Sequence, residues 1–170
     1  MIINVHSKVA FEKNNVIFKV AIFIMDSKIF TVLLIAHVLG DIIFTSHYLA
    51  LAKRKASLLK QLSGLICHGG IHFFFSGALL YIIGSQWLKG AVGVFLLHFF
   101  IDLVRCRSEG RLFGTNRVYV KRSEFFAWIF GKDKNPDKMN TRNLAPWFLI
   151  NVLDQVAHVA SLWGIACFIN

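Results

Sequence analysis

The sequence predicts an all-α membrane protein: a polytopic bundle of about four transmembrane helices with an additional interfacial amphipathic helix. Three observations predict it. Hydrophobic residues make up 56% of the 170 residues and charged residues only 16%, whereas about a quarter of a soluble domain is charged. Four stretches approach the roughly 20 apolar residues that a membrane helix needs. The basic residues gather between these stretches, which is typical of membrane proteins.

The four expected spans form a single transmembrane domain over residues 29–169. They run near residues 29–52, 61–84, 87–104 and 146–169. Pro146 suits the first turn of the fourth span, where its missing N–H leaves no hydrogen bond unmade.

A basic segment, residues 105–143, separates the third span from the fourth. Because lysine and arginine are enriched in cytoplasmic loops, we expect this segment and the loop after the first span to lie in the cytoplasm. Within it, residues 118–130 combine Lys121 and Arg122 with aromatic residues, which predicts an interfacial helix in contact with anionic lipids of the inner leaflet. The net charge of +10 is therefore assigned to membrane lipids as partners, and nucleic acid is not expected as one.

The N-terminal extension, residues 1–28, has a different character. Residues 16–25 are apolar but too short to cross a membrane, and Lys19 interrupts them. We expect either an interfacial helix or a segment outside the native chain. In the second case residues 1–24 do not belong to it, because Met25 opens a shorter chain directly ahead of the first span.

Each expected span carries two ionisable residues spaced four apart. The pairs are His37 with Asp41, His68 with His72, His98 with Asp102, and Asp154 with His158. Residues four apart lie on one face of a helix. At about 1.5 Å of rise per residue the pairs occupy overlapping depths, so facing helices would bring all eight side chains into one layer. Ionisable groups cost about 2.5–3.5 kcal/mol each inside a membrane, so their presence indicates function.

Imidazole and carboxylate groups together favour a divalent metal ion. Zn²⁺ suits them best, and Mn²⁺ or Fe²⁺ are alternatives. All eight paired residues are candidate ligands, and Asp41, Asp102 and Asp154 are also candidate catalytic residues. A metal ion with an open position acidifies bound water, which predicts a metal-dependent hydrolase acting on a lipid-like or membrane-associated substrate.

Two other interpretations use the same residues. A chain of histidines and aspartates inside a membrane is also typical of a proton or metal-ion conduit. The polar layer could instead be structural, since a lone intramembrane histidine is commonly a hydrogen-bond partner of another helix. In that case Asp102 would pair with Arg105 on its own helix. A homo-oligomer is compatible with each of these interpretations.

The same residues carry a family resemblance. The stretches Ala36–Asp41, His98–Arg105 and Asp154–His158, with His68 and His72, resemble a bacterial and phage membrane family, the domain of unknown function 3307. The resemblance covers residues 29–169, and Lys53 matches a lysine that follows the family's first span. Residues 45–48 depart from the family's Gln-Thr-Asp-Trp. The resemblance implies the architecture and a bacterial inner membrane. It also leaves open a role in phage–host membrane biology. A looser similarity, in His and Asp placement only, is to inner-membrane metal-dependent hydrolases.

Overall fold

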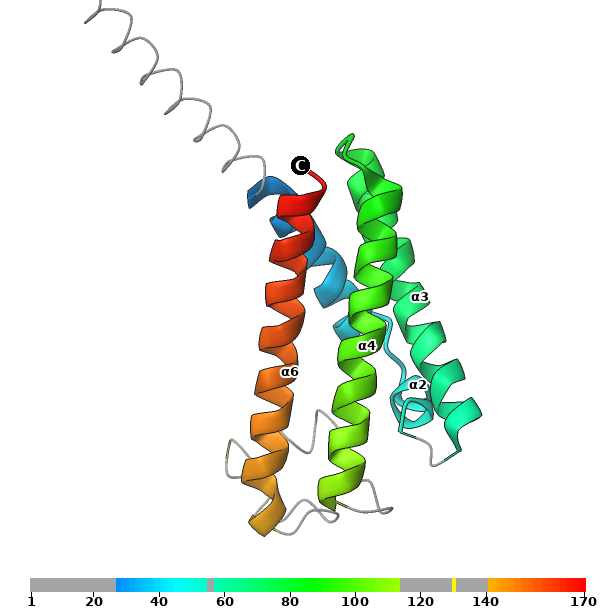
Figure 1. The fold of residues 1–170 in the computed structure, drawn as a ribbon, viewed down its shortest axis with the longest axis vertical. Helices are drawn as coiled ribbons and strands as arrows, with labels where there is room; N and C mark the ends of the chain where they lie inside the picture. The colour runs from blue at the N-terminus through cyan, green and yellow to red at the C-terminus, as the bar shows by residue number, and fades with distance from the viewer. Residues whose placement is uncertain (1–26, 55–56, 114–129, 131–140) are drawn as a thin grey trace, which may run out of the picture.

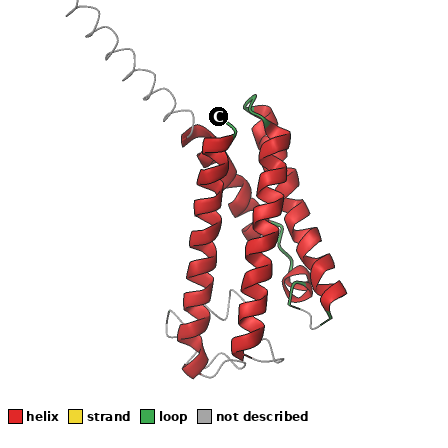
Figure 2. Ribbon diagram, in the orientation of Figure 1, coloured by secondary structure: helices red, strands yellow, loops and turns green. Residues whose placement is uncertain are grey.

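The computed structural model describes residues 27–54, 57–113, 130 and 141–170. Within these ranges the chain is helical and contains no strand (Figure 2), so the expected all-α class is confirmed. Most of the N-terminal extension and, apart from Phe130, the expected interfacial helix lie outside the described residues.

Three long helices build the bundle: α3 (Leu58–Ile82), α4 (Trp87–Phe113) and α6 (Thr141–Phe168). Each is long enough and apolar enough to cross a membrane. Helix α4 packs against both α3 and α6 (Figure 1). It continues to Phe113, into the segment assigned to the basic loop. Helix α6 begins before its expected start, so Pro146 lies inside the helix and not in its first turn, a position that membrane helices tolerate.

The turn between α3 and α4 is closed by backbone hydrogen bonds. Gly84 has a φ of +73°, a left-handed conformation that glycine adopts without steric cost. The N–H of Ser85 donates to the carbonyl of Leu80 at 3.0 Å, and that of Gly84 donates to the carbonyl of Tyr81 at 3.1 Å. This glycine-ended helix cap satisfies the last carbonyls of α3 and turns the chain directly into α4.

The expected first span, residues 29–52, is not one continuous helix. Residues 27–38 are α-helical, a π-helical turn η1 (Leu39–Ile43) follows, and the short helix α2 (His47–Ala52) begins after a break at residues 44–46. Ser46 is extended at the break, and its hydroxyl accepts the N–H of Leu49 at 3.2 Å. The hydropathy of these residues predicted one apolar helix. It could not show that Ser46 caps a new helix within the stretch.

The bundle is apolar outside and polar inside. Large exposed side chains include Phe74, Tyr81 and Val104, each at least 65% exposed. At one end of the bundle the interior is an apolar cluster: Ile29, Leu33, Leu80, Val94, Leu162, Ile165, Ala166 and Ile169. Beyond that cluster the buried side chains are largely histidine, aspartate, glutamate and lysine. This distribution is what a lipid-facing bundle with a polar interior site requires.

Two glycines of α3 give a matched test of how the broken segment packs. A Cβ on Gly64 would lie 2.7 Å from the backbone of Ala52 and of Lys53, whereas a Cβ on Gly70 would meet nothing within 4 Å. We expect Gly64→Ala to lower the free energy of unfolding by about 1–3 kcal/mol through overpacking. We expect Gly70→Ala to raise it by up to about 1 kcal/mol. Unfolding of the detergent-solubilised protein, followed by circular dichroism, measures both. Equal stability of the two variants would contradict the packing of α2 on α3.

Candidate metal centre

The four His and Asp pairs meet in the interior of the bundle. The first segment contributes His37 and Asp41, α3 contributes His68 and His72, α4 contributes His98 and Asp102, and α6 contributes Asp154 and His158. The side chain of Asp41 is 25% exposed, and the other seven residues are at most 5% exposed. The structure therefore brings together the side chains that the spacing predicted to meet. Their roles as ligands or catalytic groups stay a prediction.

Asp41 is the centre of one group of four. Its Oδ1 lies 3.1 Å from Nε2 of His68, 3.2 Å from Nε2 of His72 and 4.0 Å from Nε2 of His98. The ligand atoms of these four residues all lie within 4.8 Å of one another. With bonds of about 2.0–2.2 Å, ligand atoms of a tetrahedral site are about 3.3 Å apart. The two shorter distances suit such a site, with Asp41, His68 and His72 as three ligands and one position left open, and His98 lies farther away.

The π-helical turn η1 and Gly40 let Asp41 and His72 approach each other. A Cβ on Gly40 would lie 2.5 Å from Cε1 of His72, so only glycine leaves room for the imidazole. π-Turns within helices are frequent at functional sites because they displace one residue from the regular helical position. Here the displaced turn contains Asp41.

Thr45, at the break after η1, determines which nitrogen of His68 carries hydrogen. The Thr45 hydroxyl donates its single hydrogen to the carbonyl of Gly40 at 2.8 Å. Towards Nδ1 of His68, 3.1 Å away, the same oxygen can therefore only accept. Nδ1 of His68 must carry the hydrogen, and in the neutral imidazole Nε2 then presents a lone pair to Asp41.

His158 is oriented in the same way by the backbone. Its Nδ1 donates to the carbonyl of Asp154 at 2.9 Å, and its Nε2 has no hydrogen-bond partner within the described residues. A hydrogen bond from the other ring nitrogen to a carbonyl is the usual support of a metal-ligating histidine. In the same ranges Nε2 of His68 and of His98 also lack a hydrogen-bond partner. Buried polar atoms without partners are rare, so each of these nitrogens calls for an explanation.

The remaining predicted residues border this centre. His98, Asp102 and His158 form a second group whose ligand atoms also lie within 4.8 Å of one another. His37 Nε2 is 3.5 Å from Asp41 Oδ2 and 3.5 Å from Oε1 of Gln155. Neither His37 nor Asp154 belongs to either group of potential ligands.

Comparison with known proteins identifies the family. Residues 29–169 match the family described as "Protein of unknown function (DUF3307)". The chain belongs to the DUF3307 family. No curated protein and no solved structure matches it. The match begins at the helix that carries His37 and ends with α6, so the DUF3307 region includes every residue of the candidate centre.

A layer of ion pairs borders the centre in the DUF3307 domain. Lys53 Nζ contacts Asp102 Oδ2 at 2.7 Å, and Arg105 contacts Asp154 at 2.9 Å and Glu109 at 3.1 Å. Arg54 also contacts Glu109, at 2.9 Å. The structural interpretation allowed a pairing of Asp102 with Arg105. In the described residues Asp102 instead contacts Lys53, which directly follows α2, and Arg105 contacts Asp154 and Glu109.

Sequence reasoning missed most of these supporting residues. Lys53 entered only through the family resemblance, and Thr45, Gln155, Arg54 and Glu109 received no role. For Glu109 a periodicity was present, since it continues the inward stripe of His98, Asp102 and Arg105 on α4. Thr45 and Lys53 carried no such periodicity, because the break after η1 places them.

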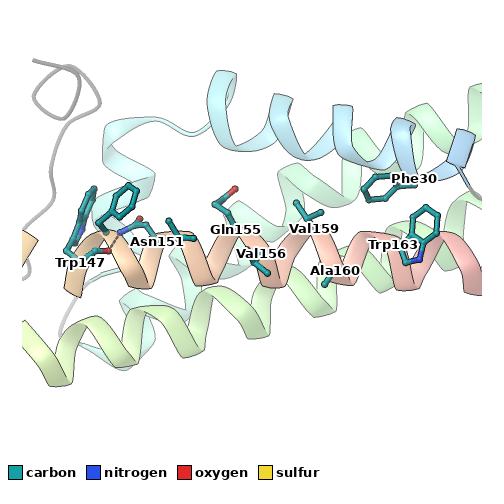
Figure 3. A pocket seen from close by; sticks show the side chains of 10 residues that line it. Phe30, Trp147, Asn151, Gln155, Val156, Val159, Ala160 and Trp163 are labelled. Atoms are coloured by element: carbon teal, nitrogen blue, oxygen red, sulfur yellow. Dashed lines mark hydrogen bonds between the residues drawn. The ribbon is translucent and has the colours of Figure 1, made fainter. Parts of the chain in front are cut away.

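An apolar groove runs along α6 beside the centre (Figure 3). It has a volume of about 800 Å³ and is lined at its ends by Phe30 with Trp163 and by Trp147. Gln155 projects from α6 into the space between α6 and the first segment. Its amide reaches both His37, at 3.5 Å, and Asp154 Oδ2, at 3.2 Å. The groove is thus joined to the polar centre through one amide side chain.

The Thr45 contact gives a prediction about His68. Thr45→Val removes the oxygen that accepts Nδ1–H of His68, so we expect the fraction of His68 in the Nδ1–H tautomer to fall. Thr45→Ser keeps this oxygen and should keep the tautomer. For a bound metal ion the valine change should weaken affinity by about 10- to 100-fold, as other losses of a ligand's supporting hydrogen bond do. ¹⁵N NMR of histidine-labelled protein, with the His68 signals assigned by their absence in His68→Gln, reports the tautomer. An unchanged His68 spectrum in Thr45→Val would refute this role of Thr45.

Proposed function

We propose that this DUF3307 protein is a membrane-embedded metal-dependent hydrolase whose centre holds a divalent ion at Asp41, His68 and His72, with His98 beside it and one position open for water. Zn²⁺ suits these ligands best, with Mn²⁺ or Fe²⁺ as alternatives. One observation carries the proposal. Asp41 Oδ1 and Nε2 of His68 face each other at 3.1 Å, although Thr45 leaves Nε2 as an acceptor in the neutral ring. Two acceptors in such contact repel each other unless a metal ion or the proton of an imidazolium lies between them, and a metal ion at this point would also contact His72.

The charges of the interior support a bound cation. Among the described residues, four interior carboxylates, those of Asp41, Asp102, Glu109 and Asp154, face three basic side chains, those of Lys53, Arg54 and Arg105. With neutral imidazoles this leaves one negative charge. In the described part of the chain every ion pair of Asp41 is with a histidine, so the excess charge is centred there. A bound divalent ion would change the net charge of the site from −1 to +1. A positive site favours loss of a proton from a bound water molecule.

Hydrolysis of an ester or phosphoester follows from that charge. With the ion bound, the oxygen of the water would bond to the carbonyl carbon or phosphorus, the ester oxygen would leave, and the proton from the water would pass to the leaving oxygen. Asp102 and Asp154 are already held by Lys53 and Arg105. His37 lies 3.5 Å from Asp41, and within the described residues its Nδ1 has no hydrogen-bond partner. His37 and Asp41 are therefore the groups best placed to move the proton.

The groove along α6 supports a lipid-like substrate. Its lining is almost entirely apolar, and the Gln155 amide connects it to His37. An acyl chain in this groove would place a polar linkage near Gln155. We propose that the substrate is an amphiphile taken from the membrane.

The location follows from the helices and the basic residues. We propose four spans, of which the segment from residue 27 to 52 is the interrupted one, in a bacterial inner membrane. The basic segment 105–143 would face the cytoplasm and contact anionic lipids of the inner leaflet. A break inside a span is tolerated where it lines a polar interior, as residues 44–46 do beside His68.

A second candidate function is a proton or metal-ion conduit. The five imidazoles form a continuous array, with ring centroids 3.7 Å apart for His72 and His98, 4.2 Å for His98 and His158, and 5.0 Å for His37 and His158. A proton would neutralise the single negative charge as well. Rings in such contact can pass protons after small rotations.

Metal content tests the centre. We expect purified wild-type protein to retain about one equivalent of Zn²⁺ after dialysis, and His72→Ala to lose it, because His72 is a direct ligand. His47→Ala is the matched control and should retain the ion, since His47 is exposed and outside both groups. Inductively coupled plasma mass spectrometry measures the ratio. Retention of zinc by folded His72→Ala would remove the proposed centre.

Turnover tests the reaction. We expect zinc-loaded protein in mixed micelles to release nitrophenolate from 4-nitrophenyl palmitate, with a rate at least about 100-fold lower in Asp41→Asn. His47→Ala should keep the wild-type rate. Liposomes carrying a pH-sensitive dye test the conduit in parallel. Proton flux that needs His37 and His98, without ester hydrolysis, would favour the second candidate over the first.

A further inference from the structure

We propose that Lys53 takes the place of a second cation, so that a centre whose side chains outline two ion positions holds one metal ion. This inference rests on the proposed metal centre and adds the number of ions and the role of Lys53. The two groups of potential ligands, Asp41–His68–His72–His98 and His98–Asp102–His158, share His98. Because Nε2 of His98 has one lone pair, it can complete only one position at a time. Asp41, His68 and His72 then form the first position and His98, Asp102 and His158 outline a second, as in centres with two metal ions about 3.5–4 Å apart.

The second position differs from the first in its charge. Its only carboxylate is that of Asp102, whose Oδ2 contacts Lys53 Nζ at 2.7 Å. Lys53 is 6% exposed and Asp102 is 2% exposed, so water screens this pair very little. A metal ion bound to Asp102 would lie about 4 Å from the ammonium group, and like charges so close in a buried site repel strongly. The first position has no such competitor, because the ion pairs of Asp41 in the described ranges are with histidines.

The fold holds Lys53 in this place. Lys53 is the C-cap residue of α2, and its backbone N–H donates to the carbonyl of Leu49 at 3.1 Å. Gly64 of α3 lets the end of α2 approach, because any Cβ there would lie 2.7 Å from the backbone nitrogen of Lys53. The ammonium group is therefore supplied from outside α4 by a rigid contact and not by a flexible surface side chain.

The position of Lys53 also fits a chemical role. Asp102 Oδ2, which holds the ammonium group, lies 3.5 Å from Nε2 of His68 and 3.7 Å from Nε2 of His98. The positive charge thus borders the proposed metal ion. A second metal ion in hydrolases stabilises negative charge on the reacting oxygens, and a fixed ammonium group can do the same without exchange.

The number of bound ions tests the inference. We expect wild-type protein titrated with Zn²⁺ to bind one equivalent, measured by isothermal titration calorimetry and native mass spectrometry. In Lys53→Met the Asp102 carboxylate is released, and we expect two equivalents. Lys53→Gln, which removes the charge but can still donate to Asp102, serves if the methionine variant does not fold, and we again expect two. Lys53→Met combined with Asp102→Asn should return to one, because the second carboxylate is then neutral.

Arg54→Met is the matched control for loss of a neighbouring positive charge. Arg54 pairs with Glu109, which belongs to neither group, so this variant should stay at one equivalent. Two equivalents in the wild type, or one in a folded Lys53 variant, would overturn the role of Lys53 while leaving the metal centre intact. A wild-type protein that binds no Zn²⁺ would refute the centre itself, and the inference with it.

Discussion

The burial of charge inside a bundle with an apolar exterior is the constraint on which the rest of the structure depends. Exposed side chains such as Phe74 and Tyr81 suit lipid, so the ionisable groups must satisfy one another in the interior. Asp102 does so with Lys53, and Asp154 with Arg105. Asp41 has only imidazoles around it in the described part of the chain. Among the described carboxylates Asp41 is therefore the one whose ion pairs include no lysine or arginine, which makes it the natural centre of a cation site.

The order of residues along each helix produces this arrangement. On α4 the inward stripe runs from Val94 through His98 and Asp102 to Glu109, and α6 repeats the order in the opposite direction. Antiparallel packing thus aligns an apolar layer, a His and Asp layer and an ion-pair layer. The apolar layer fixes helix positions at one end, and the ion pairs fix them at the other. The histidines between them are held on both sides, which is the preorganisation that a metal or proton site needs.

The spacing of four predicted the helices and the meeting of the paired residues, because inward-facing positions on a helix follow from its period. The partner of Asp102 could not be predicted in this way. Arg105 is nearer in sequence, but Lys53 reaches Asp102 through the packing of α2 on Gly64, a tertiary contact with no periodic pattern. The same holds for Thr45, whose role needs both the carbonyl of Gly40 and the ring of His68. The mean hydropathy of residues 29–52 also predicted one continuous span, because a single capping serine hardly changes that mean.

The break in the first segment accounts for more of the site than any regular helix does. The π-turn brings Asp41 to His72, the break itself places Thr45 on His68, and the short helix after it delivers Lys53 to Asp102. A continuous helix through this segment would keep Asp41 and Thr45 on one face but would turn Lys53 about 120° away from Asp41, so it could not deliver Lys53 to the same interior. Backbone irregularity in an apolar environment leaves polar groups that need partners. Here the partners are residues of the candidate centre, so the irregular segment and that centre stabilise each other.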